Sequence, residues 1–328
     1  VSWKELEGKV FAVDASLFLY QFLSSIRQRD GSLLTDSKGQ VTSHLVGLFS
    51  RTTHWLEHGM KPVFVFDGPP PALKRKVIEE RSRSKEEATK KYETARIEGD
   101  VEEMRKFASR TSKLTKEMIA ESKELLQSLG LPIVQAPSEG EAQAAFLNSR
   151  GDAWAVASQD ADCLLFGAER LVRNLAVAGK RKMKGKLSYE TVSPELLLLK
   201  DVLETLGVDR DGLIALSMLV GTDYAPSGVR GIGSKTALKT VKQFGNDRES
   251  LFKSVKWEEH CTTPWQEVFS AFKNVPVTSD YALQFKSINI AGVQDLLVGR
   301  HEFSEERVLS SLKKLGAGAS QKGLGEFL

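Results

Sequence analysis

Three apolar segments of the sequence each lead into aspartate, and the third carries a second aspartate two residues later. These acids are Asp14, Asp67, Asp160 and Asp162. Short runs rich in β-branched and aromatic residues are typical of buried parallel strands. Because open α/β sheets bind ligands beyond the carboxyl ends of their strands, we expect the four carboxylates to converge at that edge.

Three further acids extend this set. Glu139 and Glu141 follow Pro137, where a helix is expected to begin, and Asp223 follows an apolar helical segment. Taken singly, each acid is more simply explained as a helix cap or a turn residue. Taken together, seven clustered carboxylates would raise one another's pKa, and a hard divalent cation with oxygen ligands is the ordinary remedy.

The size of the set indicates more than one ion. Mg²⁺ keeps several waters and takes few protein ligands, so seven carboxylates fit two ions about 4 Å apart better than one. No histidine is placed to act as a general base. The expected chemistry is metal-assisted attack of water on a phosphodiester, with Mn²⁺ as a substitute for Mg²⁺.

The elements that position these acids are predicted from hydrophobic periodicity. The predicted strands are residues 10–13, 62–66 and 153–157. The predicted helices are residues 17–26, 43–58, 196–206 and 213–220, the last two as core helices. Strands alternating with helices predict an α/β fold with a central, mainly parallel sheet flanked by helices.

Residues 74–129 differ from the rest of the chain. The segment is long, polar and helix-prone, is broken once near Gly99, and has few apolar residues before Phe107. A helix that is polar on all sides cannot pack fully into a core, so the segment is expected to project from the body. A solvated hairpin without a function is the alternative.

Composition sets the remaining bounds. The chain has 328 residues, 41% of them hydrophobic, and a net charge of only +3, so its size suits one large domain or two small ones. Basic residues are locally concentrated, with seven Lys or Arg and no acid in residues 170–186, which favours polyanion contacts or a solvated face. Two cysteines, Cys163 and Cys261, give no disulfide framework and no zinc motif. Without a membrane-length apolar run, an intracellular protein is expected, with no membrane partner.

Six motifs, in order, resemble the flap endonucleases of the structure-specific 5′ nuclease superfamily. They are Val13-Asp-Ala-Ser, Val65-Phe-Asp-Gly-Pro-Pro-Pro, Ala136-Pro-Ser-Glu-Gly-Glu-Ala, Ser158-Gln-Asp-Ala-Asp-Cys-Leu-Leu-Phe-Gly, Gly221-Thr-Asp-Tyr and Gly231-Ile-Gly-Ser-Lys-Thr-Ala. The resemblance covers nearly the whole chain. Without a long basic tail after Leu328, the chain is more similar to the archaeal than to the eukaryotic members, which implies a cytoplasmic rather than a nuclear location.

The resemblance implies a role for each acid. One Mg²⁺ would lie among Asp14, Asp67, Glu139 and Glu141. The second would be held by Asp160, Asp162 and Asp223, with Glu141 as a bridge. The substrate implied is branched DNA with a 5′ flap, cut at a replication or repair junction.

The resemblance also implies roles for basic and aromatic positions. Lys74 and Arg81 match the pair at the base of a helical arch that acts on the scissile phosphate, and Tyr20 matches an aromatic residue that stacks on the nucleotide beside the cut. The implied DNA contacts are Arg27 and Arg51 on the template strand and Arg110 and Lys113 on the flap. A tyrosine packed in the core is the alternative for Tyr20.

The Gly-rich turn resembles the family's helix–two-turn–helix element. Gly231 and Gly233 let the backbone approach a phosphate, the following helix start favours an anion, and Lys235 would contact the duplex. In the family this turn also binds a K⁺ ion. A lone Gly-x-Gly is weak by itself and gains weight from its place after Asp223.

The last eight residues resemble the box that docks on a sliding clamp of the proliferating cell nuclear antigen type. Gln321 would enter a polar pocket, and Leu324, Phe327 and Leu328 an apolar one. Leu328 replaces the family's usual second aromatic residue. The family also has a Met-Gly start and a longer segment before the first strand, whereas this sequence begins at Val1.

The expected organisation is therefore one nuclease domain over residues 1–315, acting as a monomer, and a flexible tail over residues 316–328 that carries the clamp box. The parts of the domain are the sheet segments 1–73 and 130–170, the arch 74–129 and the helix–two-turn–helix region 221–245.

Two other functions fit parts of the pattern. One is a ribonuclease with the same carboxylate design, which the arch and the duplex-binding turn disfavour. The other is a non-catalytic adaptor for junctions and clamps, which would require a broken acid set, and none of the seven acids is replaced.

Overall fold

A computed structural model describes residues 1–176, 179–182 and 189–322. Its centre is a six-stranded sheet with the order β3-β2-β1-β4-β5-β8. All neighbouring strands are parallel except β8, which pairs antiparallel with β5. The strands of this sheet are β1 (Val10–Asp14), β2 (Lys61–Phe66), β3 (Ile133–Gln135), β4 (Ala155–Ala157), β5 (Arg170–Arg173) and β8 (Glu195–Leu198). The prediction of a mainly parallel sheet flanked by helices is confirmed.

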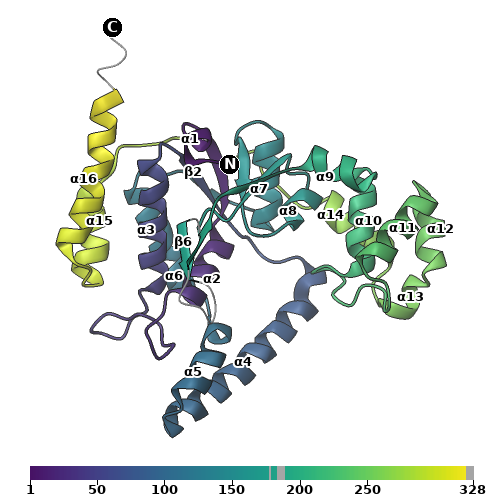
Figure 1. Cartoon of the computed structure of the whole chain (residues 1–328), viewed down its shortest axis with the longest axis horizontal. Helices are drawn as coiled ribbons and strands as arrows, with labels where there is room; N and C mark the ends of the chain where they lie inside the picture. The colour runs from purple at the N-terminus through teal and green to yellow at the C-terminus, as the bar shows by residue number, and fades with distance from the viewer. Residues whose placement is uncertain (177–178, 183–188, 323–328) are drawn as a thin grey trace.

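Helices cover both faces of the sheet (Figure 1). The N-terminal and central helices are α1 (Trp3–Leu6), α2 (Ala15–Ser25), α3 (Ser43–Glu57), α6 (Lys116–Ser128), α7 (Gly140–Ser149) and α8 (Asp162–Leu165). One core layer joins α2, α3 and α6 to the sheet, with Trp55 and Phe64 stacked at 6.3 Å between ring centroids. On the other face, a second layer is built from small residues of α7 and valines of the strands.

A second group of helices extends to one side of the sheet (Figure 1). Its members are α9 (Leu199–Leu206), α10 (Arg210–Val220), α11 (Ser234–Phe244), α12 (Arg248–Ser254), α13 (Trp257–His260) and α14 (Trp265–Lys273). They enclose a separate core that includes Trp257 and Phe252. A two-stranded hairpin, β6 (Gly179–Lys182) with β7 (Tyr189–Val192), completes the strands of the described residues.

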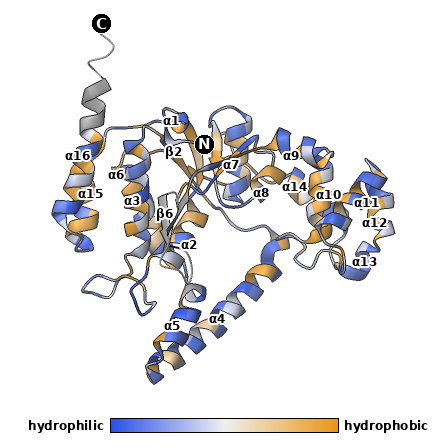
Figure 2. Ribbon diagram, in the orientation of Figure 1, coloured by the Kyte–Doolittle hydropathy of each residue, from blue (hydrophilic) through white to orange (hydrophobic). Residues whose placement is uncertain are grey.

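Two helices project from the body (Figure 1). They are α4 (Arg75–Glu98), which follows the short turn η1 (Ala72–Lys74), and α5 (Val101–Ala108), which leads into η2 (Ser109–Thr111). Only three of the 24 residues of α4 are buried, and Figure 2 shows it as mainly hydrophilic. Helix α4 ends at Gly99 with φ +71°, a conformation that glycine adopts easily.

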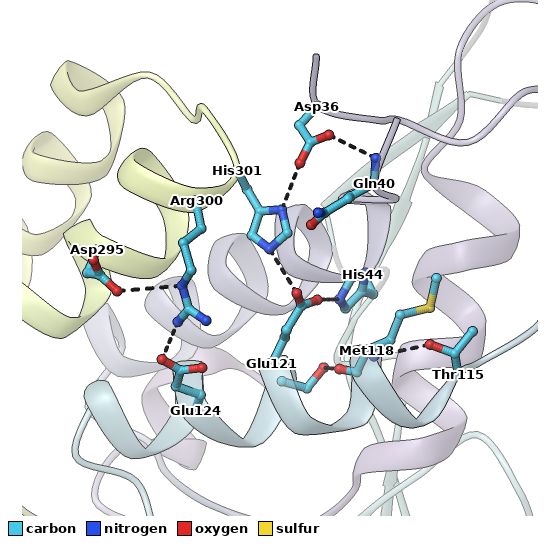
Figure 3. A network of polar contacts seen from close by, with 11 residues as sticks. Asp36, Gln40, His44, Thr115, Met118, Glu121, Glu124, Asp295, Arg300 and His301 are labelled. Atoms are coloured by element: carbon cyan, nitrogen blue, oxygen red, sulfur yellow. Dashed lines mark hydrogen bonds and ion pairs between the residues drawn. The ribbon is translucent and has the colours of Figure 1, made fainter. Parts of the chain in front are cut away.

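The C-terminal segment returns to the body. It comprises α15 (Ile290–Gln294), the π-helical turn η3 (Asp295–Arg300) and α16 (Glu305–Lys322). Figure 3 shows the polar contacts that hold this segment against α6 and the loop before α3. His301 lies 3.1 Å from Asp36 and 3.0 Å from Glu121, and the second oxygen of Glu121 lies 3.2 Å from His44. These four residues, which we call the His301 network, join three parts of the chain that are distant in the sequence.

Three details differ from the sequence predictions. Residues 195–198 form β8 instead of the start of a helix, because the free edge of β5 supplies backbone partners that outweigh local helical preference. The predicted 74–129 arch does not project as a whole, because Leu125 and Leu126 of α6 are buried in the core. Helix α16 continues through Gly316 to Lys322, where a linker was expected, and no proline interrupts it.

No helix in the described ranges has the length and apolarity needed to cross a membrane.

Candidate active site

Asp14 lies at the end of the central strand β1 and caps helix α2. Its Oδ1 accepts a hydrogen bond from the backbone N–H of Leu17 at 3.0 Å, and its Oδ2 accepts one from Ser158 at 3.3 Å. The residue is only 3% exposed. Burial, followed by the nearby carboxylates Asp67 and Asp160, raises the pKa of Asp14 from its ordinary value of 3.8 to about 7. The strand-end carboxylates therefore act on one another, as predicted from their spacing.

Gly140 brings Asp67 against the helix start that carries the two glutamates. The Oδ1 atom of Asp67 accepts a hydrogen bond from the backbone N–H of Gly140 at 2.6 Å. A Cβ atom at position 140 would lie 2.8 Å from the same oxygen, so the Asp67 side chain would have to shift away. Glycine between Glu139 and Glu141 therefore allows Asp67 to reach the helix start that carries both glutamates.

Glu141 and Asp162 connect this group to the acids after β4 and α10. Burial, then Asp14 and Asp160, raises the pKa of Glu141 well above its ordinary value. Burial, then Asp160 and Asp223, raises the pKa of Asp162 to about 6. Each raised pKa reflects first the burial of the carboxyl group and then the negative charge of its neighbours.

Two cations from the foot of α4 enter the carboxylate cluster. The Lys74 ammonium pairs with Glu139 and lies 3.3 Å from Asp223, and Arg81 lies 2.6 Å from the other oxygen of Asp223. Burial alone would lower the pKa of Lys74, but Glu139, Glu141 and Asp223 together raise it. The structure thus brings together all seven predicted acids with both predicted basic residues.

The sequence analysis missed two residues of this cluster. The hydroxyl of Tyr224 donates to Glu139, and its ring packs edge-on against Phe272 at 4.8 Å between centroids. Ser158 is buried and bridges Asp14 to the backbone N–H of Asp160. Tyr224 directly follows Asp223, and Ser158 lies two residues before Asp160. This closeness in sequence to two predicted site residues was the signal that could have indicated them.

The chemistry of the donor set fits a hard divalent cation, but the side chains are not gathered around one point. It consists of carboxylate oxygens, and three of the acids have raised pKa values that a bound cation would reverse. Within the residues that the structure describes, no three His, Cys, Asp or Glu side chains are grouped closely enough to hold an ion. Lys74 and Arg81 instead pair with Glu139 and Asp223, so ion binding would require these acids to exchange partners.

Tyr20 lies beside the cluster, on the surface of α2. The residue is 40% exposed, so the alternative of a core tyrosine is wrong. The Lys85 ammonium lies 4.7 Å from the ring centroid. Tyr20 and Arg110 line the same depression. Lys113 is exposed in the segment between η2 and α6.

The other predicted DNA contacts lie apart from the acids. Arg27 donates to the carbonyl of Gly31 and to Ser112, both at 2.8 Å. Arg51 lines a separate depression of about 530 Å³ between α3 and α16, together with Arg307 and Lys314.

The Gly-rich turn leads into α11. Gly231 has φ +85°, Gly233 is the N-cap of α11, and Lys235 is exposed in its first turn. This turn therefore presents backbone and a cation at the surface of the second helical group.

The predicted clamp box falls mostly outside the described residues. Gln321 lies in the last turn of α16, whereas Leu324, Phe327 and Leu328 lie beyond Lys322.

Comparison with known proteins identifies the family. Residues 1–88 match the XPG N-terminal domain, and residues 130–223 match the XPG I-region. Flap endonuclease 1 of Aeropyrum pernix is 49% identical over 322 residues, which are 98% of this chain and 92% of the relative. The chain belongs to the flap endonuclease family. Flap endonuclease 1 of Hyperthermus butylicus is 51% identical over 310 residues, covering 94% of this chain and 88% of the relative.

Solved structures agree with this assignment. Flap endonuclease-1 from Methanococcus jannaschii superposes with a TM-score of 0.75 at 42% identity, over 98% of this chain and 96% of that one. The catalytic core of Rad2 in complex with a DNA substrate superposes with a TM-score of 0.70 at 26% identity, over 96% and 95% of the two chains. The family resemblance seen in the motifs is thereby confirmed.

Proposed function

We propose that this protein is a structure-specific 5′ flap endonuclease, with 5′–3′ exonuclease activity, that removes 5′ flaps at replication and repair junctions. One observation carries the proposal. The carboxylate cluster at the carboxyl edge of the sheet lies at the foot of the projecting helices, and Lys74 and Arg81 reach into it from that foot. Archaeal relatives named flap endonuclease 1, at about half identity over nearly the full chain, support it.

Two Mg²⁺ ions, or Mn²⁺ in their place, would be held by the seven acids. One group is Asp14, Asp67, Glu139 and Glu141, and the other is Asp160, Asp162 and Asp223. When bound, such ions lower the pKa of water and stabilise charge on a phosphodiester. Asp14 and Glu139 are buried N-cap residues and would be held in place by the helices that they begin.

The chain's own cations would act on the phosphate. Lys74 is held near the acids by its pairing with Glu139 and Asp223, while Arg81 is exposed and free to turn toward DNA once Asp223 binds an ion. Positive groups fixed where charge develops stabilise the transition state of phosphoryl transfer. Tyr20, with an exposed ring beside the acids, would stack on the neighbouring base.

The duplex and flap would contact residues outside the acid cluster. Gly231, Gly233 and Lys235 would hold duplex phosphates, with a K⁺ ion at the same turn. Arg110 and Lys113 would guide the flap, and Arg27 and Arg51 would contact the template strand. The end of the chain, from Gln321 to Leu328, would dock on a sliding clamp.

The deciding experiment is cleavage of a 5′-labelled double-flap DNA with Mg²⁺ and with EDTA. We expect one metal-dependent cut at the flap base that leaves a 5′-phosphate. Faster cleavage of single-stranded RNA would favour the ribonuclease alternative, and tight junction binding without metal-dependent turnover would favour the adaptor.

A variant pair tests the site itself. Asp160→Ala should abolish cutting while DNA binding persists, because the acid would bind metal rather than phosphate. Asp201→Ala, an exposed aspartate on α9, is the matched control and should cut like the parent protein. Normal cutting by Asp160→Ala would refute the assignment of the cluster.

A further inference from the structure

A depression of about 390 Å³ adjoins the carboxylate cluster. We call it the Tyr20 pocket, and the lining residues used below are Tyr20, Gln21, Lys85, Arg110 and Gln159. Gln159 directly precedes Asp160, and Tyr20 lies on the helix that Asp14 caps. A volume of this size falls in the range of about 300–1,000 Å³ that small ligands occupy.

Two amide groups at this pocket lack hydrogen-bond partners. The Oε1 atom of Gln21 and the Nε2 atom of Gln159 are both shielded from solvent, and neither has a partner within the described part of the chain. Roughly nine in ten buried polar atoms in folded proteins do have one. One of these atoms is an acceptor and the other a donor, and they come from segments far apart in the sequence.

The other lining residues suit a nucleotide. Tyr20 is partly exposed, and an aromatic ring stacks with any base regardless of sequence. The Lys85 ammonium, 4.7 Å from that ring's centroid, and the exposed Arg110 supply positive charge for the attached phosphates. An unpaired base also presents at least one donor and one acceptor along its edge, which is where proteins read single strands.

We propose that the Tyr20 pocket receives one base of the 5′ flap and that Gln21 and Gln159 hydrogen-bond to its edge. The inference deepens the proposed flap endonuclease function and rests on it. Rotation of the two amides lets them pair with any of the four bases, so the contact positions the strand without selecting a sequence. Because Gln159 adjoins Asp160, a seated base fixes the flap strand relative to the acids. The two glutamines are positioning residues.

Gln21→Met and Gln159→Met test this role, since methionine keeps the length of glutamine and removes its hydrogen bonds. We expect each variant to lower kcat/KM about tenfold on an intact flap, the effect of losing roughly one hydrogen bond. A series of flaps with one abasic site near the junction provides the second arm. At the position whose base enters the pocket, the variants and the parent protein should cut equally. Equal losses on intact and abasic flaps would mean that the glutamines only support the fold, and would overturn the proposal.

A binding measurement separates this inference from the proposed function. With 2-aminopurine at the same flap position and EDTA present, the parent protein should change the emission and the two variants should change it less. Gln127→Met, on the exposed face of α6, is the matched control and should behave like the parent in both assays. If the parent protein cuts flaps but the glutamine variants match it in both assays, this inference is wrong while the proposed function stands. If the parent protein cuts no flap, the proposed function fails, and the emission change still reports whether the pocket takes a base.

Discussion

Arg81 donates from Nη2 to Asp223 Oδ1 over 2.6 Å, joining the exposed side of α4 to the loop after α10. Lys74 lies 3.3 Å from the second oxygen of the same carboxylate. An acid expected to bind a metal is thus paired with two cations of the chain. Any ion that binds there competes with both, and each cation that it releases becomes free to meet a phosphate.

Arg81→Ala tests this exchange. Because Asp223 loses a competing partner, the Mg²⁺ concentration for half-maximal rate should fall or stay unchanged. The cleavage rate at saturating Mg²⁺ should still drop about 10²–10³-fold, as when one transition-state contact is removed. Single-turnover rates across a Mg²⁺ titration measure both. The control is Arg83→Ala, an exposed arginine on the same helix. Full recovery of the rate at high Mg²⁺ would contradict a role on the phosphate.

The raised pKa values predict how stability depends on pH without metal. Asp14 and Asp162 ionise near pH 4 in the unfolded chain but at about 7 and about 6 in the folded protein. Between these values the folded state binds more protons, so the free energy of unfolding should decrease as pH rises from about 4 to 7. Thermal unfolding in EDTA measures this.

Added Mg²⁺ should reverse that loss. Its stabilisation, about 2.7 kcal/mol at a hundred times Kd, should be larger at about pH 7.5 than at about pH 5, where the acids are partly protonated. A Mg²⁺-induced rise in Tm of equal size at both pH values would argue against binding at these acids.

Tyr224→Phe should loosen Glu139 without emptying the space around it. The ring contact with Phe272 is retained, while the hydrogen bond to Glu139 is lost. We expect weaker Mg²⁺ binding and a loss of stability of about 0.5–1.5 kcal/mol, the net value of one hydrogen bond, because Glu139 keeps its pairing with Lys74. Calorimetric Mg²⁺ titration and thermal unfolding give the two values. Tyr281→Phe, which removes a hydroxyl bonded to Asp152, should leave Mg²⁺ affinity unchanged. If both variants bind Mg²⁺ like the parent, Tyr224 does not orient Glu139.

Glu121→Leu should weaken the attachment of the C-terminal segment. It leaves the buried ring of His44 without a carboxylate, at about 1–3 kcal/mol for the unpaired group, whereas His301 keeps its contact with Asp36. Glu124→Leu, one turn later, removes only a surface pair with Arg300 and should cost under about 1 kcal/mol. Denaturant unfolding compares the two, and equal losses would refute the network's structural role.

The same network predicts a loss of stability at acid pH. The hydrogen bond with His44 lowers the pKa of Glu121 below its ordinary 4.5. Its contribution is therefore fully present above about pH 4.5 and is lost as pH falls through the lower folded value. The stability difference between the parent protein and Glu121→Leu should shrink in that range.

Local patterns predicted three strands of the sheet and their terminal acids, because β1, β2 and β4 are short apolar runs buried on both faces, but did not predict β3 or β5. The strand β8 was misjudged because a leucine-rich run satisfies either structure, and only the edge of β5 decides. Tyr224 and Ser158 were missed because their role depends on which carboxylate lies opposite, and that is set by the tertiary fold. The ion pairs of Lys74 and Arg81 with acids could not be predicted from the sequence either, because the motifs suggested only contacts with phosphate.

The place of β1 in the middle of the sheet also sets the timing of assembly on the ribosome. Phe11 of β1 pairs on one side with Pro62 and on the other with Ala155. At roughly 5–20 residues per second of translation, the emerging first strand waits on the order of ten seconds for its second neighbour to be synthesised. During that interval Asp14 has none of the acids that follow β4 beside it, so under the proposed function a partly made chain lacks the group of Asp160, Asp162 and Asp223 and should not cut the nucleic acid around it.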